Sequence, residues 1–445
     1  MLTRQTRHLK RLVGSAALAL LAIAVGVGPV AAQSATDYEL WVVDQANTDV
    51  GGSKLYVYRG AQLNGNALTG APETIDLTAA AQGVGDGPGV RPHLLLFNAR
   101  HTHGVLAAVA SGHVLFVRAS DRRVTGSVDV GDQAHGAVPS ADDQIALVAN
   151  QNGKKLARIR TDYANERYVH EVAADLDLAA LEDAEHPDNA PICPVMFVDG
   201  ARKAYVTLRG GGMYVVDTEA TPMRVIRQYG RSQVAPAGCG GVVWANKVYI
   251  NSGSPTSSDL YIFDARTDQL TKHLSLTPYG TDGHGMVLTG GGRYLWFGNR
   301  GNGDNVVVID TARDEVVNVL PDVGAAPDLI DVAPGVLGRA RCEPATTVMC
   351  LAPGGTRAFV SMRPANNLTG GPSGAGERAG VTVMQISNNG QSGSRVFFFP
   401  VGTDATDTHA LAVRLTSPRV SALPATGSGG SLAGSGAPEL LHIAE

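Results

Sequence analysis

The chain has 445 residues, with 36 lysines and arginines against 41 aspartates and glutamates, and its net charge of -5 is spread thinly along the sequence. Because no basic cluster follows the N-terminal region, nucleic acid is excluded as the expected partner. Charged residues make up 17% of the chain, aromatic residues 5%, and there are 54 glycines. This composition is typical of a compact, turn-rich, all-β protein rather than a disordered one.

The N-terminus has the features of a secretory signal peptide. Four basic residues precede an uncharged stretch over 12–30, which ends in Val30-Ala31-Ala32, the small-residue spacing that a signal peptidase accepts. The sequence predicts a signal peptide over residues 1–32 and a periplasmic or secreted mature protein without a membrane span. The basic N-terminal region contains no adjacent arginine pair, which favours export of the unfolded chain. An uncleaved anchor helix is the alternative, since the stretch approaches bilayer length.

Between residues 93 and 400 the chain repeats a unit of four apolar runs separated by polar turns. The clearest unit runs from His284 to Val323, with apolar runs over 285–288, 294–297, 306–309 and 316–319. Period-two alternation and β-branched residues indicate strands rather than helices. Four short antiparallel strands per repeat form one blade of a β-propeller.

The two ends of the repeat region are expected to share one blade. Six complete units begin at residues 93, 135, 193, 239, 284 and 328. Strands over 38–43, 54–58 and 73–77 have no inner strand before them, whereas 409–413 is an inner strand with nothing after it. We therefore predict an all-β, seven-bladed β-propeller with four-stranded blades over residues 38–418, closed by pairing the C-terminal inner strand with the N-terminal strands. Residues 419–445 are predicted to be a disordered Gly/Ser-rich tail.

Two features recur within the repeats: the second strand ends in an asparagine, and the third strand ends in an aspartate that leads a turn. Examples are Asn150, Asn251 and Asn299 in second strands and Asp217, Asp264 and Asp310 in third strands. In these features the sequence resembles the YVTN-type β-propeller repeat family over most of residues 93–400. The resemblance implies the fold rather than an activity, and the asparagines and aspartates are expected to bond turn amides.

A potential metal ligand stands at the start of each inner strand. Inner strands of a propeller run along the central axis, so matching positions are expected at one height around the channel. The set, called here the mouth ring, comprises His93, His135, Cys193, Cys239, His284, Asp328 and His409. Sulfur with imidazole favours copper or zinc over magnesium or calcium. The ring therefore predicts a transition-metal or small-ligand site at the channel mouth.

Other interpretations of these residues remain open. A histidine in this position can instead bond the backbone of the neighbouring blade and close the channel. Cys193 and Cys239 lie on adjacent blades, at the edge of the distance that a disulfide spans, so metal ligation, a bridge and buried free thiols are all alternatives. Cys342 and Cys350 bracket a short polar insertion and are predicted to form a disulfide.

Two further histidines, His101 and His103, are expected in the turn after the first inner strand, at the far end of the channel. We expect these two histidines to be exposed in that turn, and the alternative is that they bind a second ion.

The mouth ring also resembles the propeller of nitrous oxide reductase, whose copper cluster is held by channel histidines, and the copper-dependent propellers of the selenium-binding and methanethiol oxidase family. The chain differs from the reductase because its ring contains cysteines and an aspartate, and because it lacks a C-terminal cupredoxin cysteine-histidine motif.

The leading functional hypothesis is an exported propeller that binds copper, zinc or a small ligand at its channel mouth. Enzymes on the same fold are an alternative class: a copper-dependent oxidase of a small sulfur compound or a lactonase-like hydrolase. A scaffold that recruits an envelope protein partner is a third. The fold alone does not choose among them.

Overall fold

The computed structural model describes residues 38–84, 87–196, 201–333, 356–365 and 376–416, all of which belong to one compact unit. The predicted signal peptide over 1–32, the predicted tail over 419–445, and Cys342 and Cys350 lie outside the described residues. Within the described part of the chain, no helix is long and apolar enough to cross a membrane.

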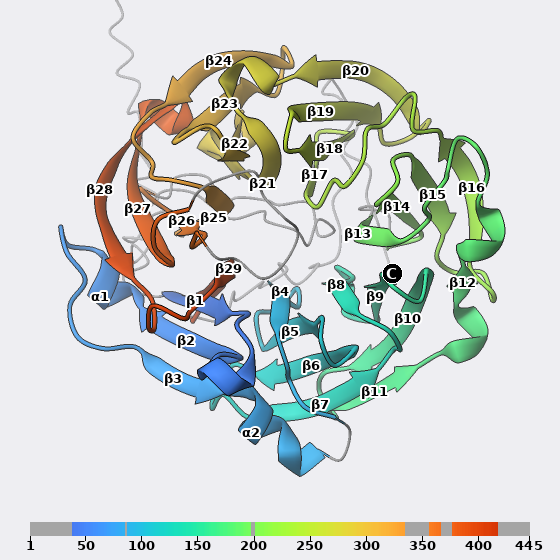
Figure 1. Ribbon diagram of the computed structural model, residues 1–445, viewed down its shortest axis with the longest axis horizontal. Helices are drawn as coiled ribbons and strands as arrows, with labels where there is room; N and C mark the ends of the chain where they lie inside the picture. The colour runs from blue at the N-terminus through green and yellow to red at the C-terminus, as the bar shows by residue number, and fades with distance from the viewer. Residues whose placement is uncertain (1–37, 85–86, 197–200, 334–355, 366–375, 417–445) are drawn as a thin grey trace, which may run out of the picture. The chain divides into compact units, whose positions relative to one another are not determined.

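Seven antiparallel sheets surround a central channel (Figure 1), as the repeats predicted. The first sheet joins the two ends of the described chain. From the channel outward it contains β29 (Thr408–Leu415), β1 (Tyr38–Asp44), β2 (Lys54–Arg59) and β3 (Glu73–Asp76). The predicted closure of the ring by a shared blade is therefore confirmed.

The other six sheets follow one another in chain order, each beginning with its innermost strand. The first two are β4 (Pro92–Phe97), β5 (His103–Ala108), β6 (His113–Arg118) and β7 (Val124–Asp129), and then β8 (Ala134–Pro139), β9 (Ile145–Asn150), β10 (Lys155–Asp162) and β11 (Arg167–His170), with β12 (Leu176–Asp177) also paired to β10. The next two are β13 (Pro191–Met196), β14 (Lys203–Leu208), β15 (Met213–Asp217) and β16 (Arg224–Tyr229), and then β17 (Gly241–Trp244), β18 (Lys247–Ser254), β19 (Ser257–Asp264) and β20 (Gln269–Ser275). The last two are β21 (Thr281–Thr289), β22 (Tyr294–Gly301), β23 (Val306–Asp310) and β24 (Glu315–Leu320), and then β25 (Pro327–Val332), β26 (Arg357–Met362), β27 (Gly380–Ser387) and β28 (Ser392–Pro400).

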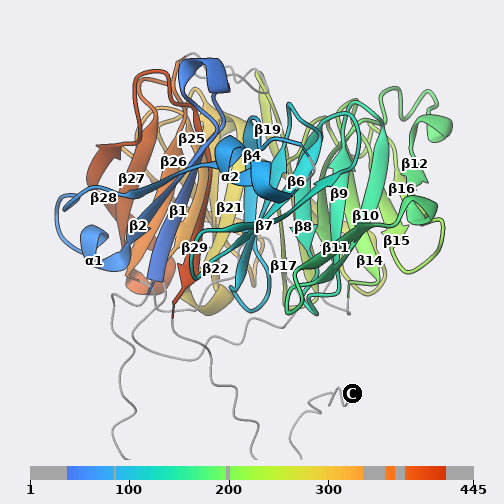
Figure 2. The ribbon, with the colours of Figure 1, turned by 90° about the horizontal axis from the view of Figure 1, so that it is seen from below.

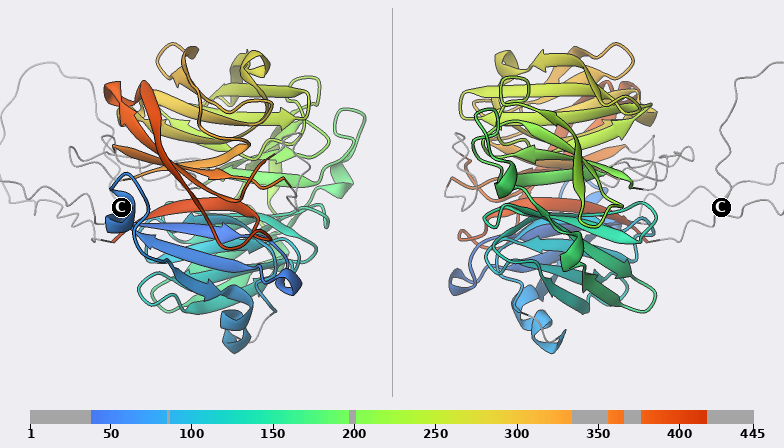
Figure 3. Two further views of the ribbon diagram at one scale, coloured as in Figure 1. Left: turned by 60° about the vertical axis from the view of Figure 1, so that its left-hand side comes forward. Right: turned by 90° about the vertical axis from the view of Figure 1, so that its right-hand side faces the viewer.

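Two short helices, α1 (Gly60–Leu63) and α2 (Leu77–Ala81), flank the shared blade. Asp76 caps α2, since its side chain accepts a hydrogen bond from the Ala79 amide at 2.9 Å. The views in Figures 2 and 3 show the strands of each blade stacked side by side, with the inner strands running along the channel.

Burial explains why inner and outer strands have different sequence patterns. The inner strands β4, β13 and β25 are buried along their whole length, because other blades pack against them on both sides. The outermost strand β20 instead alternates exposed and half-buried residues. Continuous apolar runs therefore mark the strands nearest the channel, and alternating runs mark the rim.

The repeated asparagines and aspartates are structural, as the sequence predicted. Asn251 Nδ2 donates to the Gly283 carbonyl of the next blade at 3.1 Å. Asp264 Oδ1 accepts from the Thr267 amide at 2.7 Å and so closes the turn after β19. These side chains fix the joints between strands and between blades.

Candidate functional site

The structure brings the residues of the mouth ring together at one end of the inner strands. The imidazole centroids of His93 and His135 are 4.2 Å apart, and those of His93 and His409 are 4.0 Å apart and nearly parallel. The His284 centroid lies 5.2 Å from that of His409. Asp328 contacts both His284 and His409. Residues from blades far apart in the sequence thus form one continuous cluster.

A break in strand pairing places these side chains at the channel. In six of the seven inner strands the register with the second strand shifts at the ring position, for example between Pro92 and Leu94 around His93, and between Ala134 and Gly136 around His135. A β-bulge leaves its extra residue out of the ladder and redirects its side chain. In the seventh blade, Cys239 lies two residues before β17 begins.

Two of the ring histidines are oriented by neutral oxygen acceptors. His93 Nδ1 lies 2.8 Å from Gln45 Oε1, and His135 Nδ1 lies 2.9 Å from the Ile192 carbonyl. The Gln45 amide is fixed in this orientation because its Nε2 donates to Asp407 Oδ2 at 3.0 Å. Both Nδ1 atoms therefore carry the proton.

Asp328 orients the other two histidines. Its Oδ2 lies 2.5 Å from His409 Nδ1, and its Oδ1 lies 2.7 Å from His284 Nδ1 in a contact without good hydrogen-bond alignment. A carboxylate oxygen only accepts, so the proton between Asp328 and His409 belongs to the imidazole. The carboxylate also contacts Arg363 Nη1 at 3.2 Å and Arg300 Nη1 at 3.5 Å.

The charge of Asp328 is stabilised although its side chain is fully buried. Burial alone would raise the pKa of this carboxyl, but His409, His284 and Arg300 around it hold the pKa well below its usual range. The carboxylate is therefore ionised at neutral pH.

The histidines themselves are neutral. Burial lowers the pKa of His93 well below its usual value, lowers that of His135 to about 4, and lowers that of His409 to about 3. Burial and the nearby Arg300 also lower the pKa of His284. With Nδ1 hydrogen-bonded to an oxygen, the rings of His93, His135 and His409 each present an Nε2 lone pair. The Nε2 atoms of His93 and His409 are buried and have no hydrogen-bond partner.

The cysteines of the mouth ring form a disulfide. Cys193 and Cys239 bridge adjacent blades with Cα atoms 5.2 Å apart. Both are almost completely buried and pack with Ile192 in a small apolar cluster. Of the alternatives left open by the sequence, the bridge is found. Ligation by free thiolates does not hold in this oxidised state, because each sulfur is bonded to the other, and the described residues contain no free cysteine.

A second ring of residues, which the sequence analysis missed, supports the first. Each member stands at the end of a second strand, next to the mouth-ring residue of the same blade or a neighbouring one. They are Gln45, Gln151, Arg209, Arg300 and Arg363. The signal was present in the sequence, because Gln151 and Arg300 directly follow the recurring asparagines Asn150 and Asn299.

A pocket of about 370 Å³ opens beside the mouth ring. His93, His135 and His284 line it, together with three guanidinium groups and the carboxylate of Asp282. The three arginines are Arg91, Arg209 and Arg300. Arg300 is paired with Asp282 at 3.0 and 3.1 Å. Arg209 is also paired, with Asp188 at 2.6 Å, so ion pairs as well as imidazoles line the pocket.

His101 and His103 each have contacts with neighbouring residues. His101 Nδ1 accepts from the Leu415 amide at 3.3 Å, and its ring stacks on Phe97. His103 is buried at the start of β5, 3.0 Å from Thr102 Oγ1, so the prediction of an exposed turn is wrong for this residue.

Comparisons with known proteins identify a fold but not a family. No family model and no curated protein matches the sequence. Among solved structures, a putative 6-phosphogluconolactonase from Bacteroides fragilis is similar at 11% identity, with a TM-score of 0.56 and coverage of 86% of this chain and 99% of that chain. The periplasmic gluconolactonase of Pseudomonas aeruginosa is similar at 14% identity, with a TM-score of 0.52 and coverage of 85% and 99%. At these identities the likeness concerns architecture alone: the chain is a seven-bladed β-propeller, structurally similar to lactonase-type propellers.

Proposed function

We propose that the protein binds a transition-metal ion, copper or zinc, through the Nε2 atoms of its channel histidines. The observation that carries the proposal is the pair of buried, unpartnered Nε2 atoms of His93 and His409. A buried polar atom without a partner costs about 1–3 kcal/mol. A bound ion would satisfy both lone pairs, and neutral imidazole is a preferred ligand of copper and zinc.

The surroundings of the histidines support metal binding. In metal sites the imidazole nitrogen that does not bind the ion commonly donates to a carboxylate or a carbonyl, which fixes the tautomer and raises ligand basicity. All four Nδ1 atoms here face such oxygens, supplied by Gln45, Ile192 and Asp328. This arrangement is what the outer shell of a metal site requires, and it supports the proposal.

The ligand atoms still have to approach one another. Nitrogens that share an ion stand about 2.0 Å from it, whereas no three of the four histidines offer nitrogens within 4.8 Å of one another in the described chain. Binding would therefore turn the rings. The imidazole centroids of His93 and His409 are 4.0 Å apart, so these two rings are already neighbours.

Charge balance permits a cation despite the nearby arginines. Arg363 is paired with Asp407 and Asp328, and Arg300 is paired with Asp282 and Asp328. The pocket beside the ring leaves room for a small ligand to reach the ion. The disulfide supports export of the chain, since such bonds persist in oxidising compartments.

Metal analysis of the disulfide-intact protein tests the proposal. After dialysis against copper or zinc, we expect about one ion per chain. The variant H93Q/H409Q should bind the ion at least about tenfold more weakly, while H273Q, which alters an imidazole outside the mouth ring, should bind like the wild type. Less than a tenth of an ion per chain, or equal affinity in H93Q/H409Q and wild type, would overturn it.

A further inference from the structure

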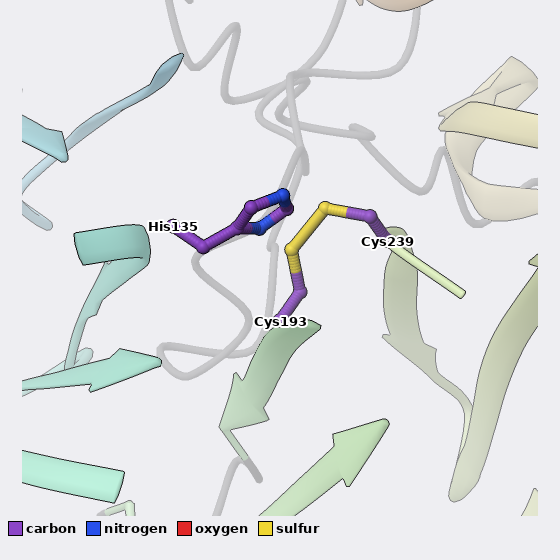
Figure 4. A group of neighbouring side chains, drawn as sticks. All are labelled: His135, Cys193 and Cys239. Atoms are coloured by element: carbon purple, nitrogen blue, oxygen red, sulfur yellow. A yellow bond between two sulfur atoms is a disulfide. The ribbon is translucent and has the colours of Figure 1, made fainter. Parts of the chain in front are cut away.

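One group of side chains in the mouth has the spacing of a metal site without any movement of the rings. His135, Cys193 and Cys239 offer three ligand atoms that all lie within 4.8 Å of one another (Figure 4). No other set of three histidine, cysteine, aspartate or glutamate side chains in the described residues meets this spacing. The two sulfurs are engaged with each other, so the site is closed in the oxidised protein.

We propose that the Cys193–Cys239 disulfide is a redox gate: its reduction opens a second, softer metal site made by His135, Cys193 and Cys239, which takes Zn²⁺ or Cu⁺. The electrons come from a dithiol, which gives up two electrons and two protons and becomes a disulfide, while the Cys193–Cys239 bond is converted to two thiols. Metal binding then releases the two thiol protons to solvent. Thiolate ligands suit both ions.

The cysteines are held together by more than their own bond. Thr207, at the end of β14, accepts from the Cys193 amide at 3.4 Å through Oγ1 and donates the same hydroxyl to the Gly238 carbonyl at 2.5 Å. One side chain therefore joins the backbones of both cysteine segments. Reduction would leave the two sulfurs as neighbours, close to the separation that a common ion requires.

Glycines on both sides of Cys239 allow its segment to pack closely against neighbouring strands. A Cβ atom on Gly238 would come within 1.9 Å of the Asn251 carbonyl oxygen, and one on Gly240 would come within 2.5 Å of the His284 carbonyl oxygen. Gly238 thus packs against β18 of its own blade, and Gly240 packs against β21 of the next blade. This packing fixes the position of the segment that carries Cys239.

A reductant and an ion have a route to the sulfurs. Cys239 and His135 both line the pocket of about 370 Å³. The three ligands leave a fourth coordination position for water or a small molecule, as in open zinc sites. The inference shares His135 with the proposed function, so reduction would divert this imidazole from the histidine cluster to the thiolates.

Cobalt(II) is the probe that tests the gate, because thiolate ligation gives it a strong near-ultraviolet charge-transfer absorption. The background is C342S/C350S, in which no other thiols can contribute. The protein is reduced with a dithiol, desalted without oxygen and mixed with one equivalent of Co²⁺. We expect the thiolate band in the reduced protein and not in the oxidised one, with the band lost in C193S/C239S and the cobalt affinity at least about tenfold lower in H135Q.

The outcomes separate this inference from the proposed function. A thiolate band after reduction, with no ion bound to the oxidised protein, would support the gate and reject the four-histidine site. An ion bound by the oxidised protein, with no thiolate band after reduction, would reject the gate alone. A band that persists in C193S/C239S, or loss of the native far-ultraviolet circular dichroism on reduction, would also overturn the gate.

Discussion

The two halves of the channel mouth use the same position of the repeat in opposite ways. On one side, His284, His409 and the buried Asp328 form a charged and hydrogen-bonded network that includes Arg300 and Arg363. On the other side, Cys193 and Cys239 join two adjacent blades by a covalent bond inside an apolar cluster. The polar half keeps nitrogen lone pairs available for a ligand, whereas the covalent half withholds its sulfurs. A repeat fold can thus vary chemistry around one ring without changing the backbone.

The polar half is expected to be the more sensitive to a single substitution. D328N removes the carboxylate that neutralises Arg300 and Arg363 in a fully buried setting. Loss of one partner from a buried charge network costs about 3–5 kcal/mol, and we expect that decrease in the free energy of unfolding, measured by urea denaturation.

A second aspartate of β25 serves as the control for this substitution. Asp331 is also buried, but it accepts only from the amides of Val413 and Val332. Burial raises its pKa to about 7, so at neutral pH it already carries a proton much of the time. D331N should lower the free energy of unfolding by less than half as much as D328N. Equal losses would show that burial rather than charge pairing governs the polar half.

Removal of the disulfide in the covalent half is expected to lower the free energy of unfolding somewhat less than D328N does. The disulfide closes a loop with a sequence separation of 46 residues. By the chain-entropy argument, C193S/C239S should lower the free energy of unfolding by about 2–4 kcal/mol. Urea denaturation of this variant beside the wild type measures the effect, and an unchanged unfolding midpoint would contradict it.

The pH dependence of stability should distinguish the histidines from Asp331. Because the pKa of His135 is about 4 when folded and about 6.5 when unfolded, the unfolded chain binds a proton that the native chain does not between these values. Stability from this group is therefore full above pH 6.5 and is lost as the pH falls toward 4. H135Q should flatten this decline in urea midpoints recorded from pH 7 to 4.5.

Asp331 affects the pH dependence of stability in the opposite direction to His135. Its folded pKa of about 7 lies above the ordinary value of 3.8, so the native chain binds more protons between these values, and stability from this group is lost as the pH rises toward 7. D331N should therefore steepen the loss of stability on acidification. A pH profile of D331N identical to the wild type would argue against a raised pKa.

The smallest effect is expected at the rim of the pocket. Arg209 is paired with Asp188 at 2.6 Å, but both side chains are partly exposed. Exposed ion pairs contribute at most about 1 kcal/mol, so R209Q should change the free energy of unfolding by less than that and leave the metal affinity of the mouth within about twofold. A loss comparable to that of D328N would extend the polar network to the rim.

The sequence predicted the repeat, the closure of the ring and the ligand-type residues at the start of each inner strand, because these follow from periodicity. It did not predict the β-bulges, since these depend on pairing between strands. Nor did it predict the partner of His93: Gln45 is fixed by Asp407, 362 positions away. The state of Cys193 and Cys239 could not be predicted from the sequence, because the spacing of neighbouring blades allows either a disulfide or a shared metal ion.

The pairing of β29 with β1 has a consequence for biogenesis. His409 and Gln45 belong to the blade that only the last-made part of the propeller completes. The polar half of the mouth therefore cannot assemble on a nascent or truncated chain that ends before β29. An ion bound there would stabilise the pairing of β29 with β1, because it would bind only the closed ring. Metal binding at the mouth would therefore occur only after the ring is complete.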